Sequence, residues 1–243
     1  MTIRVAINHR TSYKFDRPVN RSPHTVRLRP APPARTPLHR HRPKVQPEDH
    51  VINGPQDAFG NDLARLVFAE TTPEFEVDVE VIADMTTINP FDFFVEDYAE
   101  NYPFDYTEQL TNELLPYLET IECGPLFDKF LAEADRKKRT INDFLVDINQ
   151  YVQGAVEYLV RLEPGIQTPE ETLELGKGSC RDSAWLLAQL LRHMGLATRF
   201  ASGYLVQLRP DEKALDGPSG AAEDFTDLHA LSLIHISEPT RRA

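Results

Sequence analysis

The stretch ELGKGSCRDSAW, residues 174–185, holds one of the two cysteines of the chain in a setting that favours a reactive thiol. Cys180 follows Gly-Lys-Gly-Ser and opens an apolar run with helical spacing, so we expect it in the first turn of a helix. A cysteine reacts as its thiolate, which a helix N-terminus and the nearby cations Lys177 and Arg181 would favour. These features make Cys180 a candidate nucleophile and suggest oxyanion-binding or positioning roles for Ser179 and Arg181.

A cysteine nucleophile also needs room for its substrate and a base. Gly176 and Gly178 lack side chains and would let a substrate approach the thiol closely. Among the eight histidines, His229 in the segment DFTDLHA is the candidate base. It lies 49 residues after Cys180, so the fold has to bring the two together. Two unrelated residues could show the same spacing, so the spacing by itself is weak evidence that Cys180 and His229 form a catalytic pair.

The first 85 or so residues have the pattern of antiparallel β-strands. In EFEVDVEVIADM, apolar residues recur at every second position, which is typical of a strand with one buried face: Phe75, Val77, Val79 and Val81. Three further segments alternate in the same way: IRVAINHRTSYKF, HTVRLRP and DLARLVFAE. Because Pro-rich or turn-forming stretches separate these segments and no helical pattern intervenes, we predict a β-sandwich for residues 1–95.

The pattern becomes helical from about residue 105. The segment before it, NPFDFFVEDYAENYPFDY, is rich in aromatic and acidic residues and is expected to be a linker, with the boundary between the two domains near residues 95 to 105. Thr140 is a plausible N-cap for the helical run TINDFLVDINQYVQGAVEYLV. The run SCRDSAWLLAQLLRHMGL predicts the helix that Cys180 opens, and Gly195 fits its end. The following segment, ATRFASGYLVQL, indicates a pair of strands.

Composition limits the classes of function. The chain has 243 residues, of which 41% are hydrophobic and 26% charged, and its net charge of −12 argues against nucleic acid as the main partner. No run approaches the roughly 20 apolar residues of a membrane span, and no signal-peptide hydrophobic region is visible. We therefore expect a cytoplasmic protein with free thiols and no membrane partner.

No cofactor is expected, because no phosphate loop, nucleotide motif or metal site is visible in the sequence. The segment HRHRPK, with His39 and His41, could hold a metal or an anion. No third ligand has a helpful spacing, so we expect a solvated strand or loop there.

Several motifs in a consistent order resemble one known family. The segment GKGSCRDSAWLLAQLLRHMGLATRFASGYL, followed by DLHA, closely resembles the transglutaminase-like superfamily in its bacterial form. The N-terminal segments NHRTSYKF, VRLRPAP, DAFGN and INPFDFF look like the β-rich domain that precedes the core in these bacterial proteins. The resemblance covers nearly the whole chain up to Ala230.

The resemblance implies an α+β fold, with an N-terminal antiparallel β-sandwich followed by a papain-like core at residues 105–230. It implies that Cys180 attacks an amide carbonyl to form a thioester, with His229 as general base and acid. Water would then give hydrolysis, and a second amine would give amide transfer. The implied partner is a protein or peptide substrate. Relatives with this N-terminal domain include long fusions, so the chain could be a domain of a longer protein of peptide or amide metabolism.

The end of the chain departs from the family pattern. The family has Trp after His-Ala and an orienting Asp about one strand later, and neither is present; no Asp follows Asp227. Asp227 would share a strand face with His229, in a poor position to hold the ring. Residues 231–243 resemble translated sequencing-adapter read-through, so we expect a non-native tail rather than a genuine strand over Leu231–Ile236, and no site role for His235. We therefore expect a truncated core with an open edge, low stability and little activity.

Three functions stay open. The first is acyl transfer on amide bonds, and the second is a cysteine peptidase or amidase with the same dyad, since both pass through the same thioester. The third is a non-catalytic binding or scaffold module, which the missing Asp would fit. Other residues near the site are expected to have no role in the chemistry: Asp182 as a solvated charge, Trp185 and Tyr204 as packing residues, and Cys123 as an inert thiol.

Overall fold

The computed structural model describes residues 2–31, 36–86, 94–209 and 223–236. The chain divides into two compact units, Met1–Pro90 and Phe91–Ala243, each with its own core. The predicted aromatic and acidic linker, NPFDFFVEDYAENYPFDY, begins with five residues, 89–93, that lie outside the described residues. Within the described part of the chain, no helix is both long enough and apolar enough to cross a membrane.

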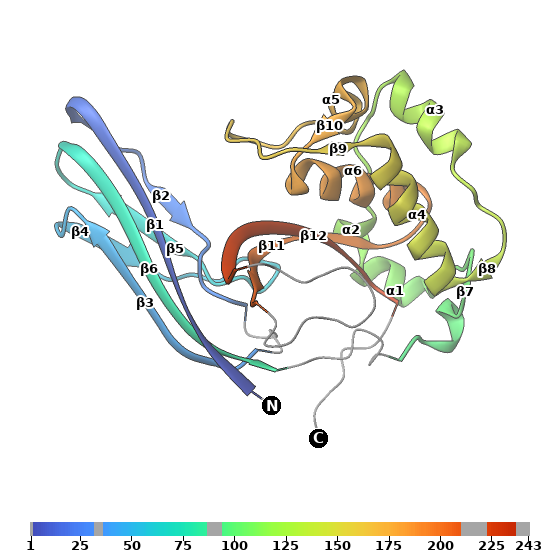
Figure 1. Cartoon of the computed structure of the whole chain (residues 1–243), viewed down its shortest axis with the longest axis horizontal. Helices are drawn as coiled ribbons and strands as arrows, with labels where there is room; N and C mark the ends of the chain where they lie inside the picture. The colour runs from blue at the N-terminus through green and yellow to red at the C-terminus, as the bar shows by residue number, and fades with distance from the viewer. Residues whose placement is uncertain (1, 32–35, 87–93, 210–222, 237–243) are drawn as a thin grey trace. The chain divides into compact units, whose positions relative to one another are not determined.

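The first unit is built from two three-stranded antiparallel sheets (Figure 1). One sheet has the order β1-β6-β3, with β1 at Thr2–Val19, β3 at Leu38–Gln46 and β6 at Thr72–Thr86. The other has the order β2-β5-β4, with β2 at His24–Val26, β4 at His50–Asn53 and β5 at Ala64–Phe68.

Strand β6 supplies the buried face that its alternating sequence predicts. All four of the apolar residues named above are at most 5% exposed: Phe75, Val77, Val79 and Val81. The ring of Phe75 meets the edge of Phe68 on β5 at 5.4 Å between centroids, so the two sheets share an aromatic core. This arrangement agrees with the predicted sandwich.

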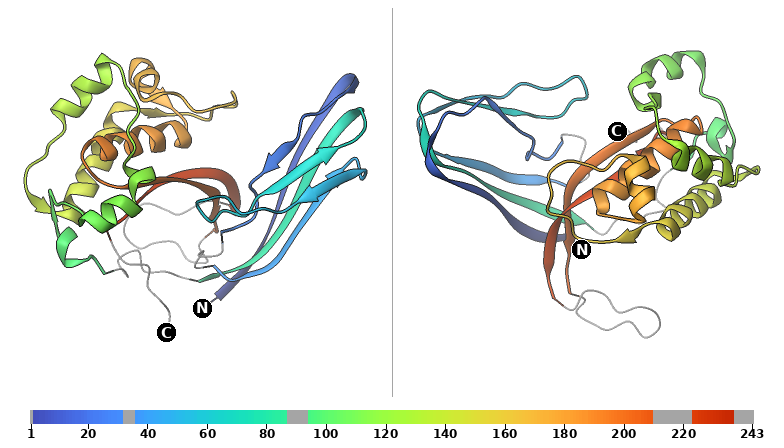
Figure 2. Two further views of the ribbon diagram at one scale, coloured as in Figure 1. Left: turned by 180° about the vertical axis from the view of Figure 1, so that it is seen from behind. Right: turned by 90° about the horizontal axis from the view of Figure 1, so that it is seen from above.

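The second unit combines helices with short strands and one long strand pair (Figure 2). Its helices are η1 Asp97–Ala99, α1 Glu108–Glu113, α2 Leu115–Leu118, α3 Pro125–Glu133, α4 Ile141–Ala155, α5 Pro169–Leu175 and α6 Cys180–His193. Its strands are β7 Asn101–Tyr102, β8 Arg139–Thr140, β9 Glu157–Tyr158, β10 Lys177–Gly178, β11 Thr198–Gln207 and β12 Phe225–Ile234. Together the units give the α+β class that the sequence predicted.

Helix α6 lies at the centre of this second unit. Residues on nearly every side of it are buried, including Leu186, Leu190 and Leu191 at 1% exposure or less. It packs against α4 and α5 and lies along both β11 and β12 (Figure 1). Gly195, with φ of +85°, follows its last turn as expected for a helix end. A helix so enclosed gives its first residue a fixed position.

Two expectations about the strands of this unit are wrong. The segment expected to form a strand pair is one continuous strand, β11, which pairs antiparallel with β12 over its full length. Residues 231 to 234, where a genuine strand was not expected, continue β12, and Ile236 is 7% exposed in the core. The alternating apolar residues of this segment suffice for a strand, because every second side chain can reach α6. The remainder of the expected tail, residues 237–243, lies outside the described residues.

Candidate active site

The predicted nucleophile occupies the position that the sequence indicates. Cys180 is the first residue of α6, and Ser179 is its N-cap. The main-chain N–H and the hydroxyl of Ser179 both donate to the Asp182 carboxylate, at 2.9 and 2.7 Å. Among the described residues, the main-chain N–H groups of Cys180 and Arg181 have no acceptor. Two donors at the positive end of a helix are therefore available beside the thiol.

Asp182 was expected to be a solvated charge, and that expectation is wrong. Its carboxylate is fully buried and accepts hydrogen bonds from Arg161 Nε at 2.9 Å and Nη2 at 3.0 Å. The main-chain N–H of Gln167 donates a further hydrogen bond at 2.8 Å, in addition to the two from Ser179. Burial alone would raise the pKa of Asp182, but the hydrogen bonds from Arg161, Ser179 and Gln167 outweigh it and lower the pKa below its usual value.

The side chains of the two residues predicted to bind an oxyanion or to position the site, Ser179 and Arg181, both hydrogen-bond to neighbouring protein groups. The Ser179 hydroxyl is committed to Asp182, and the residue is 6% exposed. The Arg181 guanidinium donates to the main-chain oxygens of Arg161, at 3.2 Å, and of Glu163. Both side chains therefore have partners within the protein, whereas the main-chain N–H groups of Cys180 and Arg181 have none among the described residues.

The local structure explains why glycine occupies each of the two positions 176 and 178 before Cys180. Gly176 caps α5 with φ of +60°, a left-handed conformation that glycine adopts without strain. A Cβ on Gly178 would lie 2.9 Å from the Cβ of Asp182 and 3.1 Å from Oε1 of Gln167. The space at Gly178 is thus needed by the buried Asp182, contrary to the expectation that it leaves room for substrate.

The structure places the strand that carries His229 beside the thiol. Cys180 Sγ lies 3.9 Å from the main-chain oxygen of Leu228, the residue before His229. The main-chain N–H of Leu228 is bonded to Asp227 Oδ1 at 2.8 Å. Both main-chain groups of Leu228 thus point away from β11, where its cross-strand partner is Tyr204. The thiol therefore sits against the free edge of β12.

The imidazole itself is not joined to the thiol. Within the described ranges, no hydrogen bond links Cys180 to His229, and no carboxylate is bonded to the His229 ring. Ser232 donates to the Ala184 oxygen of α6 at 2.7 Å, and Ala230 is 6% exposed, so even-numbered residues face the helix. Strand alternation puts the half-buried His229 on the opposite face. The structure thus places the strand beside the candidate nucleophile, while the ring of His229 has no hydrogen bond to Cys180 or to a carboxylate among the described residues.

Three other residues considered in the sequence, Cys123, His235 and Trp185, make packing or hydrogen-bond contacts. The Cys123 thiol donates to the Ile121 oxygen at 3.5 Å, and burial raises its pKa. His235 stacks on Tyr117 at 4.9 Å, and burial followed by the charge of Arg199 lowers the pKa of His235. Trp185 packs edge-on against Phe200 at 6.0 Å.

The histidines of HRHRPK lie on β3 in the first unit, where His39 bonds Asp84 at 2.5 Å. Burial lowers the pKa of the other histidine of this segment, His41. In the described residues, no group of three or more His, Cys, Asp or Glu side chains could hold a metal ion.

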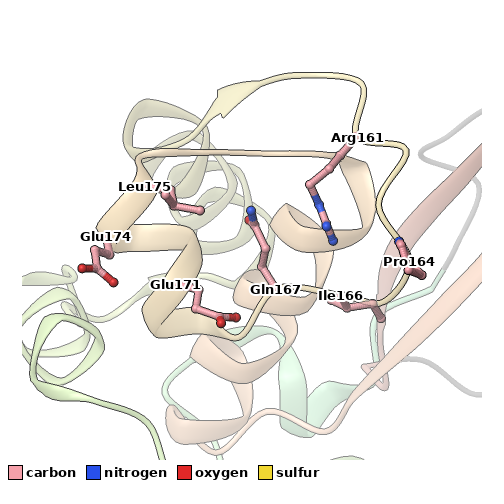
Figure 3. Close-up of a pocket in the computed structure, with 7 residues that line it drawn as sticks. All are labelled: Arg161, Pro164, Ile166, Gln167, Glu171, Glu174 and Leu175. Atoms are coloured by element: carbon pink, nitrogen blue, oxygen red, sulfur yellow. The ribbon is translucent and has the colours of Figure 1, made fainter.

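An open concavity of about 490 Å³ lies on the loop that supplies Arg161 (Figure 3). Its lining residues are Arg161, Pro164, Ile166, Gln167, Glu171, Glu174 and Leu175. Figure 3 shows Arg161 extending from this loop toward α6, where it meets Asp182. The loop and the first turn of the helix are thus joined.

Comparison with known families matches both units. A model of the bacterial transglutaminase-like N-terminal region matches residues 5–84. A model of the transglutaminase-like superfamily matches residues 128–231, which include both Cys180 and His229. The chain belongs to the transglutaminase-like superfamily. This confirms the family that the motifs around Cys180 resemble.

A solved structure supports the same fold for this superfamily member. The crystal structure of a "putative cysteine protease" from Cytophaga hutchinsonii matches with a TM-score of 0.63 at 18% sequence identity. The match covers 99% of this chain and 79% of that one. At this identity the likeness establishes the fold, which is of the cysteine-peptidase and acyltransferase type. A search among curated proteins gave no significant match.

Proposed function

We propose that this protein forms a thioester at Cys180 by attack on the carbonyl of a protein or peptide amide. The observation that carries the proposal is the place of the thiol, at the first residue of α6 and 3.9 Å from the strand that bears His229. Membership of the transglutaminase-like superfamily supports the same chemistry.

In the proposed first step, the His229 ring takes the proton from the Cys180 thiol. The thiolate attacks the carbonyl carbon, and the oxyanion accepts hydrogen bonds from the main-chain N–H groups of Cys180 and Arg181. The C–N bond then breaks, and the amine leaves with the proton held by the imidazolium. Cys180 now carries the acyl group as a thioester.

In the second step, an acceptor attacks the thioester and frees the thiol. Water gives a carboxylate, and a primary amine gives a new amide, with His229 passing the acceptor's proton back to sulfur. No sequence feature chooses between these acceptors. We propose acyl transfer as the reaction, with hydrolysis by the same dyad as the alternative outcome of the experiment below.

Turnover in this chain should be slow. A carboxylate that orients the catalytic histidine contributes about 10⁴ to kcat in serine proteases, and no described carboxylate bonds to His229. Formation of the acyl-enzyme depends mainly on the thiol and the oxyanion donors, so it is the step best preserved here.

The test uses dimethylated casein as acyl donor and a biotinylated pentylamine as acceptor. Biotin incorporated into casein indicates transfer, released ammonia without biotin indicates side-chain amide hydrolysis, and new casein fragments indicate a peptidase. Each signal should disappear in Cys180→Ser and persist in Cys123→Ser. If none of the three appears, or if Cys180→Ser retains it, the proposed function is wrong and a binding role replaces it.

A further inference from the structure

The first turn of α6 is tied to the loop of residues 159–167 by a closed set of contacts. Arg161 donates two hydrogen bonds to the Asp182 carboxylate and one to the Gly165 oxygen, at 2.8 Å. In the other direction, the Arg181 side chain on the helix donates hydrogen bonds to the main-chain oxygens of Arg161 and Glu163 on the loop. The thiol-bearing residue comes directly before Arg181 and two residues before Asp182, the two helix residues that make the contacts with the loop.

Burial makes the partnership of Arg161 and Asp182 obligatory. Asp182 is fully buried, and the side chain of Arg161 is 13% exposed. A buried carboxylate without its cation is strongly unfavourable, while the two-point geometry of a guanidinium fixes the orientation of its partner. The same carboxylate accepts both donors of Ser179, so its position sets the start of the helix.

The charge of Asp182 also matters for the neighbouring thiol. The carboxylate belongs to the same helical turn as Cys180, and an unneutralised negative charge there would oppose the thiolate. Arg161 supplies the neutralising charge from outside the helix. The other charged groups around this turn, among the described residues, include Lys177 on β10, Arg181 on α6, Glu163 on the loop, Glu171 on α5, and Asp227 and His229 on β12.

We propose that Arg161 and Asp182 are positioning residues for Cys180, whose ion pair fixes the first turn of α6 and removes the negative charge that the thiolate would otherwise face. This inference rests on the proposed role of Cys180 as nucleophile. Nothing in the spacing of the sequence points to Arg161, which lies 21 residues before its partner.

The experiment measures the rate of iodoacetamide alkylation of Cys180 from pH 5 to 10, in a Cys123→Ser background so that a single thiol is followed. In Arg161→Met the buried carboxylate loses its cation, and we expect the profile to move about one unit upward, which is about tenfold slower alkylation at pH 7. In Arg161→Met/Asp182→Asn the charge is gone, and the midpoint should return toward that of the parent. A purely structural role predicts the opposite order, with the double variant at least as impaired.

The matched control is Asp143→Asn. Asp143 and its N-cap Thr140 stand at the same helix positions in α4, joined by a 2.7 Å hydrogen bond, with no connection to the thiol. This variant should leave the Cys180 profile unchanged. Melting curves by circular dichroism establish that each variant is folded.

If Arg161→Met does not fold, Arg161→Lys decides the matter, because lysine keeps the charge and loses the two-point geometry. We then expect an unchanged midpoint with a two- to fivefold lower limiting rate. An Arg161→Met profile within twofold of the parent, a loss that the double variant does not relieve, or an Arg161→Lys variant identical to the parent would each overturn the proposal. Alkylation of the thiol does not require turnover of an amide substrate. A protein without amide chemistry would therefore refute the proposed function and leave the role of Arg161 and Asp182 to be decided by the alkylation rates.

Discussion

The Sγ atom of Cys180 lies 3.9 Å from the main-chain oxygen of Leu228, so the candidate nucleophile contacts the strand one residue before the candidate base. The contact is made at the free edge of β12, while strand alternation turns the His229 ring to the other face. Proton transfer from the thiol to the ring therefore requires the strand around His229 to rearrange. This geometry leads to a specific expectation for the base.

His229→Gln should slow acylation of Cys180 at pH 7 and leave the rate at pH 10 unchanged. At neutral pH the imidazole has to take the thiol proton, whereas hydroxide does so at high pH. We expect a loss of about tenfold, below the usual 10² to 10⁴ for a general base, because no described carboxylate holds the ring. The measurement is the nitrophenolate burst from p-nitrophenyl acetate. His50→Gln, in the first unit, is the control, and equal rates for His229→Gln and the parent at pH 7 would exclude His229 as the base.

Gly178→Ala should destabilise the second unit by about 1–3 kcal/mol, the usual cost of inserting an atom into a packed site. The added Cβ would meet the Asp182 side chain at 2.9 Å, beneath the nucleophile. Urea unfolding, followed by the fluorescence of Trp185, measures the change. Gly154→Ala in α4 meets nothing within 4 Å and should be stabilising by about 0.5–1 kcal/mol, typical of glycine replacement in a helix. Equal stabilities for the two variants would contradict the tight packing at Gly178.

Arg21→Met should stabilise the first unit by about 1–2 kcal/mol, since apolar replacement of a costly buried charge is often favourable. Arg21 is 8% exposed, its guanidinium lies 3.6 Å from the centroid of Phe68, and none of its nitrogens has a partner among the described residues. Burial lowers the pKa of this guanidinium, which reflects the same cost. Thermal unfolding of Arg21→Met beside Arg17→Met, an exposed control, measures it. A lower melting temperature for Arg21→Met would show that the contact with the ring outweighs desolvation.

The contribution of Asp84 to stability should vanish in acid. Hydrogen bonds from Arg4 and then His39 hold the pKa of Asp84 at about 2, below its ordinary 3.8. A carboxyl whose pKa is lower in the folded state stabilises fully above the ordinary value and loses this contribution as the pH falls through the folded value. The difference in unfolding free energy between the parent and Asp84→Asn should therefore shrink between pH 4 and pH 2. Urea titrations at these pH values test it, with Asp16→Asn as an exposed control, and a difference that does not change with pH would contradict the assignment.

The sequence was most informative where periodicity and local chemistry coincide. The alternation in β6 predicts its buried face, because side chains two apart must share a side of the strand. The apolar helical run after Gly-Lys-Gly-Ser predicts Cys180 in the first turn of a helix, and α6 begins at Cys180.

The sequence was least informative where distant segments meet. Asp182 looks like an exposed charge in a helix, and only the folded chain shows it buried against Arg161 from a separate loop. Likewise, residues 231 to 234 form a strand by pairing with β11, whereas their likeness to adapter read-through had led us to expect no genuine strand. The face of β12 on which the His229 ring lies depends on the register of the strand pair, because a slip of one residue would move every side chain to the opposite face.

The most direct test of the central claim is the site of acylation. The chain is mixed with p-nitrophenyl acetate at pH 7, quenched in acid, digested and analysed by mass spectrometry. The two thiols serve as internal comparison, since Cys123 is half-buried with a raised pKa. We predict an acetyl group on the peptide that contains Cys180, little on that of Cys123, and loss of the burst in Cys180→Ser. Acetylation at Cys123 in preference to Cys180, or an unchanged burst in Cys180→Ser, would contradict the assignment of Cys180 as the nucleophile.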